Sequence, residues 1–329
     1  MIKLKAIFIL MALCASSAFA ITGDVILETG AEPAFCEQVG ERVTTVINAF
    51  ESGDLARERG LFTDEGYRVT CRLLKETGLK NGRRTHRTNL IKLDRGGWEV
   101  RDIKVNVELG ETAKNDVLAA TDPTEYLVFE LTDQGLIDYA GFSTARGHVK
   151  KLVEDGLRLK DAARRMKILQ TVEVFRTAYC VKDIDYLKWI YSDDALIIVG
   201  KVLQPNEDLP DMLENSCLDK ERIKFVKKSK ADYIKGLESV FQNNAYVKVI
   251  FDSLDVLRHS ADPDLYGVTL KQNWYSSSYS DTGWVFLLWD FKDEKKPLIY
   301  VRSWQPDKFE DGSILGLYDF KIERGTGDE

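Results

Sequence analysis

The chain has 329 residues with 46 basic and 53 acidic side chains, and its formal charge of −7 argues against a general nucleic-acid binder, which normally has a basic domain. Apolar residues make up 44% and aromatic residues 10%, which is enough for a buried core and excludes a disordered chain. At about 100–200 residues per domain, the length predicts two domains.

The first twenty residues have the pattern of an export signal. Lys3 and Lys5 precede an apolar run, and Ala18-Phe19-Ala20 forms the small-residue site that a signal peptidase cleaves. The run is too short to span a bilayer of about 30 Å, and no later segment has the ~18 uninterrupted apolar residues of a membrane span. Cys14 lacks the small preceding residue of a lipoprotein signal. We therefore predict cleavage after Ala20 and a periplasmic or secreted protein without a transmembrane segment.

Four cysteines remain after this cleavage, and they allow two interpretations. An even number in an oxidising compartment permits two disulfides, most economically Cys36–Cys71 and Cys180–Cys217. The alternative is four separately buried thiols, which pack like small apolar side chains. The sequence contains no Cys-x-x-Cys pair, so it predicts neither a redox dithiol nor a cysteine-based zinc site.

Residues 49–69 and 178–198 match each other without a gap, which indicates an internal repeat. The identical pairs are Ala49 with Ala178, Asp54 with Asp183, and Asp64 with Asp193. Apolar residues at helical spacing predict a long helix before each match, over 35–50 and 166–179. Asp54 and Asp183 predict the caps of a second, short helix, and strands are expected at 67–74 and 195–202. Each half then ends in a predicted hairpin, at 126–143 and at 284–304.

The second half carries an insertion of about forty residues between its first two strands. The insertion includes a predicted helix that begins near Ser229, with Asp232 at capping-box spacing and Ile234, Leu237 and Phe241 as its buried stripe. The first half has only a predicted loop at 76–86. The first domain is therefore expected to be an abbreviated version of the second.

A basic connector joins the two halves. Residues 146–167 contain eight Lys or Arg side chains and read as an amphipathic helix. Such a helix can bind membranes or acidic partners, but we expect it to pack against its own acidic protein. The predicted organisation is a signal peptide at 1–20, a first domain at 21–145, a helical connector at 146–165, a second domain at 166–320 and a tail at 321–329.

The run Tyr191-Ser192-Asp193-Asp194-Ala195 follows a long and a short helix and precedes strands that end in long hairpins. This order resembles the nuclear transport factor 2-like superfamily, which includes ketosteroid isomerase and polyketide-cyclase-like proteins, and the C-terminal stretch looks like an exported branch of it. The resemblance covers about 160–305, and 33–144 less fully because the inner helix is missing. It implies an α+β fold with two tandem cone-shaped domains, each with helices packed on a curved antiparallel sheet, the first abbreviated.

The resemblance also allows a test for catalysis. Ketosteroid isomerases place a carboxylate base four residues after the alanine of this run and a tyrosine donor twenty residues before it. The base positions fall here on Val199 and Thr70, and the donor positions on Phe175 and Val46. None of the four supplies the proton acceptor or donor that its position requires. We therefore predict no catalytic residue, and the dispersed histidines predict no metal or cofactor.

Aromatic residues gather in the last hairpin region, where four of the six tryptophans fall between 274 and 304. We predict that Leu288 pairs with Tyr300, which would place Trp284 opposite Trp304 on one face. Such pairs can simply stabilise the sheet. Alternatively, the face binds a ligand or a partner protein, and Arg302 orients an anionic or polar ligand. The candidate binding residues are Trp274, Tyr279, Trp284, Phe286, Tyr300, Arg302 and Trp304.

These features favour an exported, non-catalytic binding protein. It would use the second-domain pocket or the aromatic sheet face for an unknown small ligand or an envelope partner protein. Two alternatives remain open: a small-molecule isomerase, cyclase or dehydratase of the same fold, and a structural module that forms a homodimer through the sheet face. No nucleic-acid partner is predicted.

Overall fold

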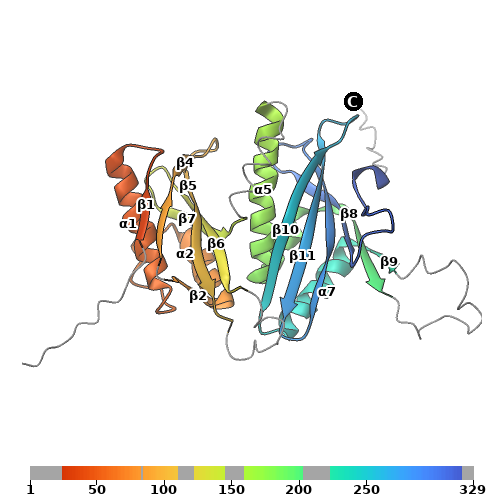
Figure 1. The fold of residues 1–329 in the computed structure, drawn as a ribbon, viewed down its shortest axis with the longest axis horizontal. Helices are drawn as coiled ribbons and strands as arrows, with labels where there is room; N and C mark the ends of the chain where they lie inside the picture. Colours follow the sequence, from red (N-terminus) through yellow and green to blue (C-terminus); the bar gives the residue numbers. More distant parts are fainter. Residues whose placement is uncertain (1–23, 83, 110–121, 145–158, 203–222, 321–329) are drawn as a thin grey trace, which may run out of the picture.

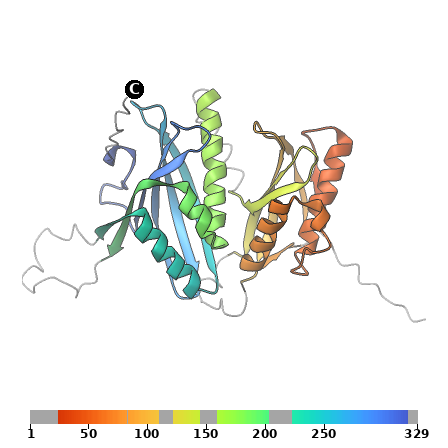
Figure 2. The same ribbon diagram turned by 180° about the vertical axis from the view of Figure 1, so that it is seen from behind.

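The computed structural model describes residues 24–82, 84–109, 122–144, 159–202 and 223–320. The predicted signal peptide, most of the connector, Cys217 and the tail lie outside these ranges. The fold is α+β, with helix α5 (Leu159–Cys180) standing between the sheets of the two halves (Figures 1 and 2). Within the described ranges, no helix is long and apolar enough to cross a membrane.

In its described residues, the N-terminal half contains two α-helices, one 3-10 turn (Arg59–Leu61) and two sheets. Its helices are α1 (Pro33–Ala49) and α2 (Asp64–Thr77), and its strands are β1 (Asp24–Leu27), β2 (Leu79–Lys80), β3 (Thr85–Thr88), β4 (Leu90–Lys92), β5 (Trp98–Val107), β6 (Thr124–Leu131) and β7 (Ile137–Phe142). The main sheet has the order β2-β5-β6-β7, with β4 also paired to β5, while β1 and β3 form a separate parallel pair. The predicted hairpin at 126–143 is confirmed as the antiparallel pair β6–β7.

The C-terminal half contains one six-stranded sheet with the order β10-β11-β12-β13-β8-β9. Its further elements are α6 (Ile184–Ile190), β8 (Tyr191–Val202), β9 (Ile223–Lys228), α7 (Lys230–Asn243), β10 (Val247–Arg258), β11 (Leu265–Ser276), β12 (Ser280–Asp290) and β13 (Leu298–Gln305). All neighbouring strands are antiparallel except β13 and β8. Two helices cover one face of this sheet, α5 along β10 and α7 across β8.

The predicted starts of the two shorter helices of the C-terminal half are confirmed because local capping decides them, whereas the long helix predicted over 166–179 spans Leu159–Cys180. The Asp183 side chain accepts a hydrogen bond of 3.2 Å from the Tyr186 backbone N–H at the start of α6. Ser229 Oγ accepts one of 3.1 Å from the Asp232 N–H at the start of α7. The expected stripe of α7 is buried, and Tyr233 belongs to it as well.

The predicted strand at 67–74 is wrong, because residues 64–77 form the helix α2. Thr63 caps this helix by accepting a hydrogen bond of 3.0 Å from the Gly66 N–H, and Gly78 ends it with a positive φ of 59°. The short helix expected to begin at Asp54 is not formed there: the Asp54 carboxylate accepts from the Ala56 N–H in a turn, and only a 3-10 turn, Arg59–Leu61, follows. The two matched segments therefore each follow a long helix, α1 or α5, but they take different structures after it.

Most buried apolar residues of the two halves form one continuous cluster, from Val25 on β1 to Ile299 on β13, and a small second cluster lies on the outer face of the C-terminal sheet. Ion pairs cross the same seam: Arg101 on β5 binds Glu173 on α5, and Arg176 on α5 binds Glu125 on β6. Each half has its own sheets, but they share a core. The predicted domain boundary at residue 145 lies outside the described ranges.

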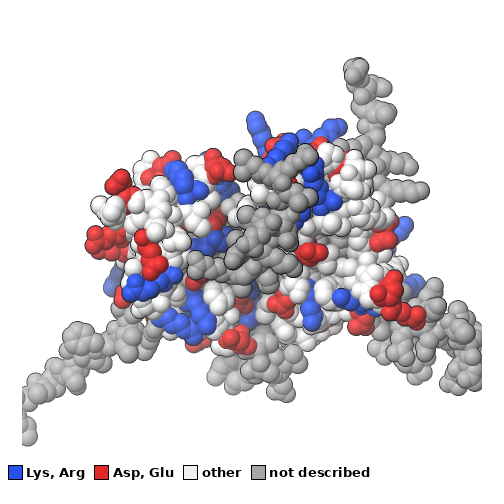
Figure 3. Space-filling view, turned by 45° about the horizontal axis from the view of Figure 1, so that its top comes forward, with Lys and Arg blue, Asp and Glu red and all other residues white. Residues whose placement is uncertain are grey.

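The described part of the basic connector pairs with acidic side chains of its own protein. Arg164 Nη2 lies 2.8 Å from Asp264 Oδ1 and 2.9 Å from Glu294 Oε1, and Lys160 Nζ lies 2.7 Å from the same Glu294 oxygen. In Figure 3, acidic and basic side chains are interspersed over the face in view. This pairing supports the expectation that the start of α5 packs against the chain itself.

Candidate functional site

The register of the last hairpin differs from the prediction by one residue. Trp284 pairs with Gln305, and Val285 pairs with Trp304. Tyr300 is the additional residue of a bulge, since Trp289 pairs with Ile299 and Leu288 pairs with Val301. A shift of one residue moves a side chain to the opposite face of a sheet. The prediction that Trp284 and Trp304 share a face is therefore wrong.

The shift distributes the seven candidate residues over different surfaces. Trp274, Arg302 and Trp304 lie on the inner face of the sheet, which α5 and α7 cover. Trp284 and Phe286 lie on the outer face, where Phe286 stacks on Phe320 with a centroid distance of 5.5 Å. The two remaining residues are Tyr279, which is 55% exposed, and the half-buried bulge residue Tyr300.

Three tyrosines surround Arg302 on the inner face. The hydroxyl of Tyr179 on α5 lies 2.7 Å from that of Tyr233 on α7 and 3.4 Å from that of Tyr191 on β8. The guanidinium of Arg302 lies 5.1 Å from the centre of the Tyr233 ring, a cation–π distance. Burial raises the pKa of Tyr191 and Tyr233 well above the usual range, so both hydroxyls stay protonated.

Next to this cluster lie three buried polar atoms that have no hydrogen-bond partner among the described residues. They are Asp281 Oδ1 on β12, and Arg302 Nε and Trp304 Nε1 on β13. Gly283 lies between them on β12, where a Cβ atom would stand 2.8 Å from Trp304 Nε1, so glycine lets the indole lie against the strand. Burial raises the pKa of Asp281, although Tyr279 and the charge of Arg302 oppose this shift.

The arrangement therefore offers two donors and one acceptor to a small polar molecule. Trp274 pairs directly with Asp281 across the strands, and its ring makes an edge contact of 5.7 Å with Tyr179. Trp274 and Trp304 are half-buried and form the rim of the site. The three unpaired atoms have no contact with solvent, so a ligand reaches them only when a rim side chain moves.

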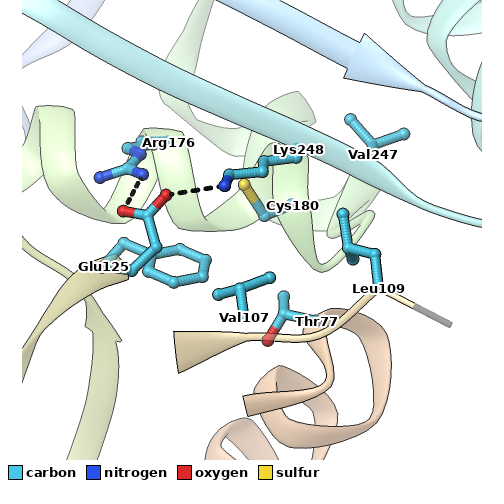
Figure 4. Close-up of a pocket in the computed structure, with 9 residues that line it drawn as sticks. Thr77, Val107, Leu109, Glu125, Arg176, Cys180, Val247 and Lys248 are labelled. Atoms are coloured by element: carbon cyan, nitrogen blue, oxygen red, sulfur yellow. Dashed lines mark hydrogen bonds and ion pairs between the residues drawn. The ribbon is translucent and has the colours of Figure 1, made fainter. Parts of the chain in front are cut away.

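A small hollow lies in the seam between the halves, and it is too small for an organic ligand (Figure 4). Its volume of about 10 Å³ is about that of a single water site. Glu125 joins Arg176 at 2.6 Å and Lys248 at 3.5 Å along its wall. The hollow is lined by Thr77, Val107, Leu109, Glu125, Phe142, Arg176, Cys180, Val247 and Lys248.

The predicted Cys36–Cys71 disulfide is wrong, because Cys36, Cys71 and Cys180 are free thiols. Cys36 donates to the Ala31 carbonyl at 3.6 Å, at the start of α1. Cys71 lies on α2, in the segment expected to be a strand, so its predicted position does not apply. Cys180 accepts from the Val249 N–H at 3.3 Å, and burial raises the pKa of this thiol to about 11. Its expected partner Cys217 lies outside the described residues.

In the run Tyr191–Ala195, the acidic residue Asp193 has a structural role. Lys230 at the start of α7 binds Asp193 Oδ1 at 2.8 Å and the Tyr191 carbonyl at 2.9 Å, which ties α7 to β8. The hydrogen bond from Lys230 holds the pKa of Asp193 below its usual range. Within the described part of the chain, no group of three or more His, Cys, Asp or Glu residues is arranged to hold a metal ion.

Sequence reasoning missed Asp281 and the three tyrosines. Asp281 lies two residues before Gly283 and four before Val285, so strand alternation puts it on the inner face once the register is known. The tyrosines come from α5, β8 and α7, and no local pattern brings them together.

Comparisons with known proteins add to this geometry. No family model matches the chain, and no curated protein matches it. Among solved structures, Bd1075 of Bdellovibrio bacteriovorus is 16% identical, with 52% of this chain and 46% of that chain covered and a TM-score of 0.33. A nuclear transport factor 2-like protein from Cytophaga hutchinsonii is 14% identical, with 43% and 97% covered and a TM-score of 0.31.

A putative dehydratase of the same family from Streptomyces avermitilis is 10% identical, with 40% of this chain and 87% of that chain covered and a TM-score of 0.28. This chain spans about half the length of the Bdellovibrio protein, 46% of it. At such identities and TM-scores these are similarities alone, and we take no function from them.

Proposed function

We propose that this protein is an exported, non-catalytic binding protein that holds a small ligand on the inner face of the C-terminal sheet, between Trp274, Trp304 and Arg302. One observation carries the proposal: Asp281 Oδ1, Arg302 Nε and Trp304 Nε1 are buried without partners on two adjacent strands. Each unpaired buried polar group costs about 1–3 kcal/mol. A ligand that pairs with all three would recover that free energy.

We also propose a nuclear transport factor 2-like fold for this chain and a location outside the cytoplasm. The order α5, α6, β8, α7 and then four strands supports a nuclear transport factor 2-like C-terminal domain, with the N-terminal half as a degenerate tandem copy. Export rests on the signal pattern that ends at Ala20.

The inner face is favoured over the outer face as the functional surface. Leu317 packs in the same buried cluster as Phe286, Leu288 and Val301, and Lys308 lies 4.5 Å over the Trp284 ring. The chain's own C-terminal segment therefore covers much of the face that a sheet-mediated homodimer would use. For this reason we favour ligand binding over a role as a dimerisation module.

Native mass spectrometry of the mature protein, purified from its own envelope fraction without detergent, tests the proposal. We expect an additional mass of a few hundred daltons, which is lost in Trp304→Phe and kept in Trp284→Phe. Both variants remove one indole N–H from the same hairpin, but only the first removes it from the inner face. The mass of the protein after the ligand is removed also shows whether the chain begins at Ile21, as cleavage after Ala20 predicts. A bare protein, or a bound second protein in place of a small molecule, contradicts the proposal.

An enzymatic role is the second candidate, because Asp281 is a carboxylate on the inner face beside Arg302 with a pKa raised by burial. A carboxyl group in that state can transfer protons. On this alternative, Asp281→Asn would keep ligand binding and abolish conversion of the ligand. Loss of binding in Asp281→Asn without any turnover in the wild type would refute it.

A further inference from the structure

We infer that the ligand of this site is an organic carboxylate with a flat or cyclic body, whose carboxylate group is held by Arg302 and Trp304. This inference rests on the proposed function and adds the chemical class of the ligand.

The first support is the charge of Arg302. The described residues include five buried arginines, and four of them have a carboxylate partner: Arg101, Arg164, Arg165 and Arg176. Arg302 is the fifth. It is 5% exposed, and no ion pair joins it to a carboxylate of the described residues. The Asp281 carboxylate is near enough for the two charges to interact, but it does not pair with the guanidinium, whose Nε–H has no acceptor. A buried charge with an unpaired donor is unfavourable, so the fold leaves a place for an acceptor, and best for an anion, at this guanidinium.

The second support is the number of free donors and their place on one strand. The tyrosine cluster lies on one side of the guanidinium, where Tyr233 provides a ring face at 5.1 Å. The Nε–H has no partner, and neither has the indole N–H of Trp304, two residues further along the same strand and face. Two donors from one strand face match the two oxygens of one carboxylate, and charge-assisted hydrogen bonds are about twice as strong as neutral ones.

The third support concerns the body of the ligand. Asp281 Oδ1 accepts and does not donate when ionised, so it calls for a hydroxyl or N–H group on the ligand. Trp274 lies directly opposite Asp281 in the strand register, so a flat or cyclic body held at Asp281 would stack on this indole. Entry requires the half-buried Trp274 or Trp304 side chain to shift, which makes binding an induced fit.

The test compares matched probes that differ only in charge. The dissociation constants of 4-hydroxyphenylacetate and glucuronate are measured by calorimetry against 4-hydroxyphenylacetamide and glucuronamide, on the full mature protein. We expect at least one carboxylate to bind about tenfold or more tightly than its amide. Trp304→Phe should weaken that carboxylate about tenfold, and Trp284→Phe should leave it unchanged. Arg302→Gln should bring acid and amide to similar affinities.

Two results would overturn the inference. One is that neither acid binds more tightly than its amide, and the other is that Trp304→Phe and Trp284→Phe behave alike. If the native mass spectrum still shows a bound small molecule that is lost in Trp304→Phe, only the inference that the ligand is a carboxylate is refuted, and the proposed binding function stands. If no small molecule is bound there either, the proposed function fails with it. Because Arg302→Gln leaves a cavity and can impair folding, the Trp304→Phe comparison is the deciding one.

Discussion

The glutamate in the seam between the two halves provides a quantitative test of the shared core. Glu173 on α5 is 2% exposed and accepts three hydrogen bonds. Two come from Thr144, at 2.6 Å from its N–H and 2.9 Å from its hydroxyl, and the third comes from Arg101 on β5. Glu173→Gln keeps the size and shape of the side chain and removes its charge.

All three donors bind Glu173 Oε1, so the glutamine can replace these hydrogen bonds only with weaker ones to its neutral amide oxygen, and it removes the charge that pairs with Arg101. Arg101 would retain only Glu99, 3.2 Å away. A buried hydrogen bond to a charged group contributes about 1.5–3 kcal/mol, and breaking a buried ion pair costs about 3–5 kcal/mol. With one pair partly retained, we expect the free energy of unfolding to fall by about 3 kcal/mol.

Urea unfolding followed by two signals measures this loss. Tryptophan fluorescence reports mainly on the C-terminal half, which contains five of the six tryptophans, and far-UV circular dichroism reports on the whole chain. In the wild type the two transitions should coincide because the core is continuous. Glu130→Gln is the control, since its partner Arg95 is 58% exposed and the pair should contribute less than about 1 kcal/mol. A loss in Glu173→Gln no larger than in this control, or two separate wild-type transitions, would refute the reasoning.

Three further predictions concern the local structure. Gly66→Ala places a Cβ atom 2.1 Å from a backbone oxygen of β7 and should cost about 1–3 kcal/mol in thermal unfolding, whereas Gly60→Ala meets nothing within 4 Å and should cost less than about 1 kcal/mol. Burial tends to raise the pKa of Asp161, but hydrogen bonds from Tyr266 and Arg165 outweigh this effect and hold the pKa below its usual range. Stability from the ionised form is complete above the unfolded pKa of about 3.9 and is lost as the pH falls through the folded pKa, so Asp161→Asn should flatten this acid-side decline in stability. Ellman titration of the unfolded, unreduced protein should detect at least the three free thiols of the described cysteines, and fewer would contradict their assignment.

Most of the C-terminal half could be predicted because its signals are local. The caps at Asp183 and Ser229 are short side-chain contacts to nearby backbone, and the buried stripes of α5 and α7 follow the helical period. The prediction of a strand at 67–74 was wrong because it was inferred from the alignment with the C-terminal half, whereas Asp64–Thr77 form α2. Thr63 and Gly78 are the N-cap and C-cap of α2, and these local signals predict the helix better than the alignment between the two halves does.

The register of the last hairpin could not be predicted in the same way. A single extra residue, Tyr300, shifts the pairing, and the neighbouring β8 carries its own irregularity where Ile299 pairs with Tyr191 and Val301 with Leu196. Both follow from the fit of β13 between two strands that are far apart in the sequence. This fit placed Trp284 outside the site and Trp304 inside it.

The sequence by itself determined the α+β class, the long helices and the final hairpin. These features depend on periodicity, caps and composition, which a short stretch of chain contains. Only the tertiary structure decided that Arg302 has three tyrosines around it and that, among the described residues, no carboxylate forms an ion pair with it, although Asp281 lies near. Those neighbours come from α5, β8 and α7, and whether a buried charge is compensated depends on which segments the fold brings together.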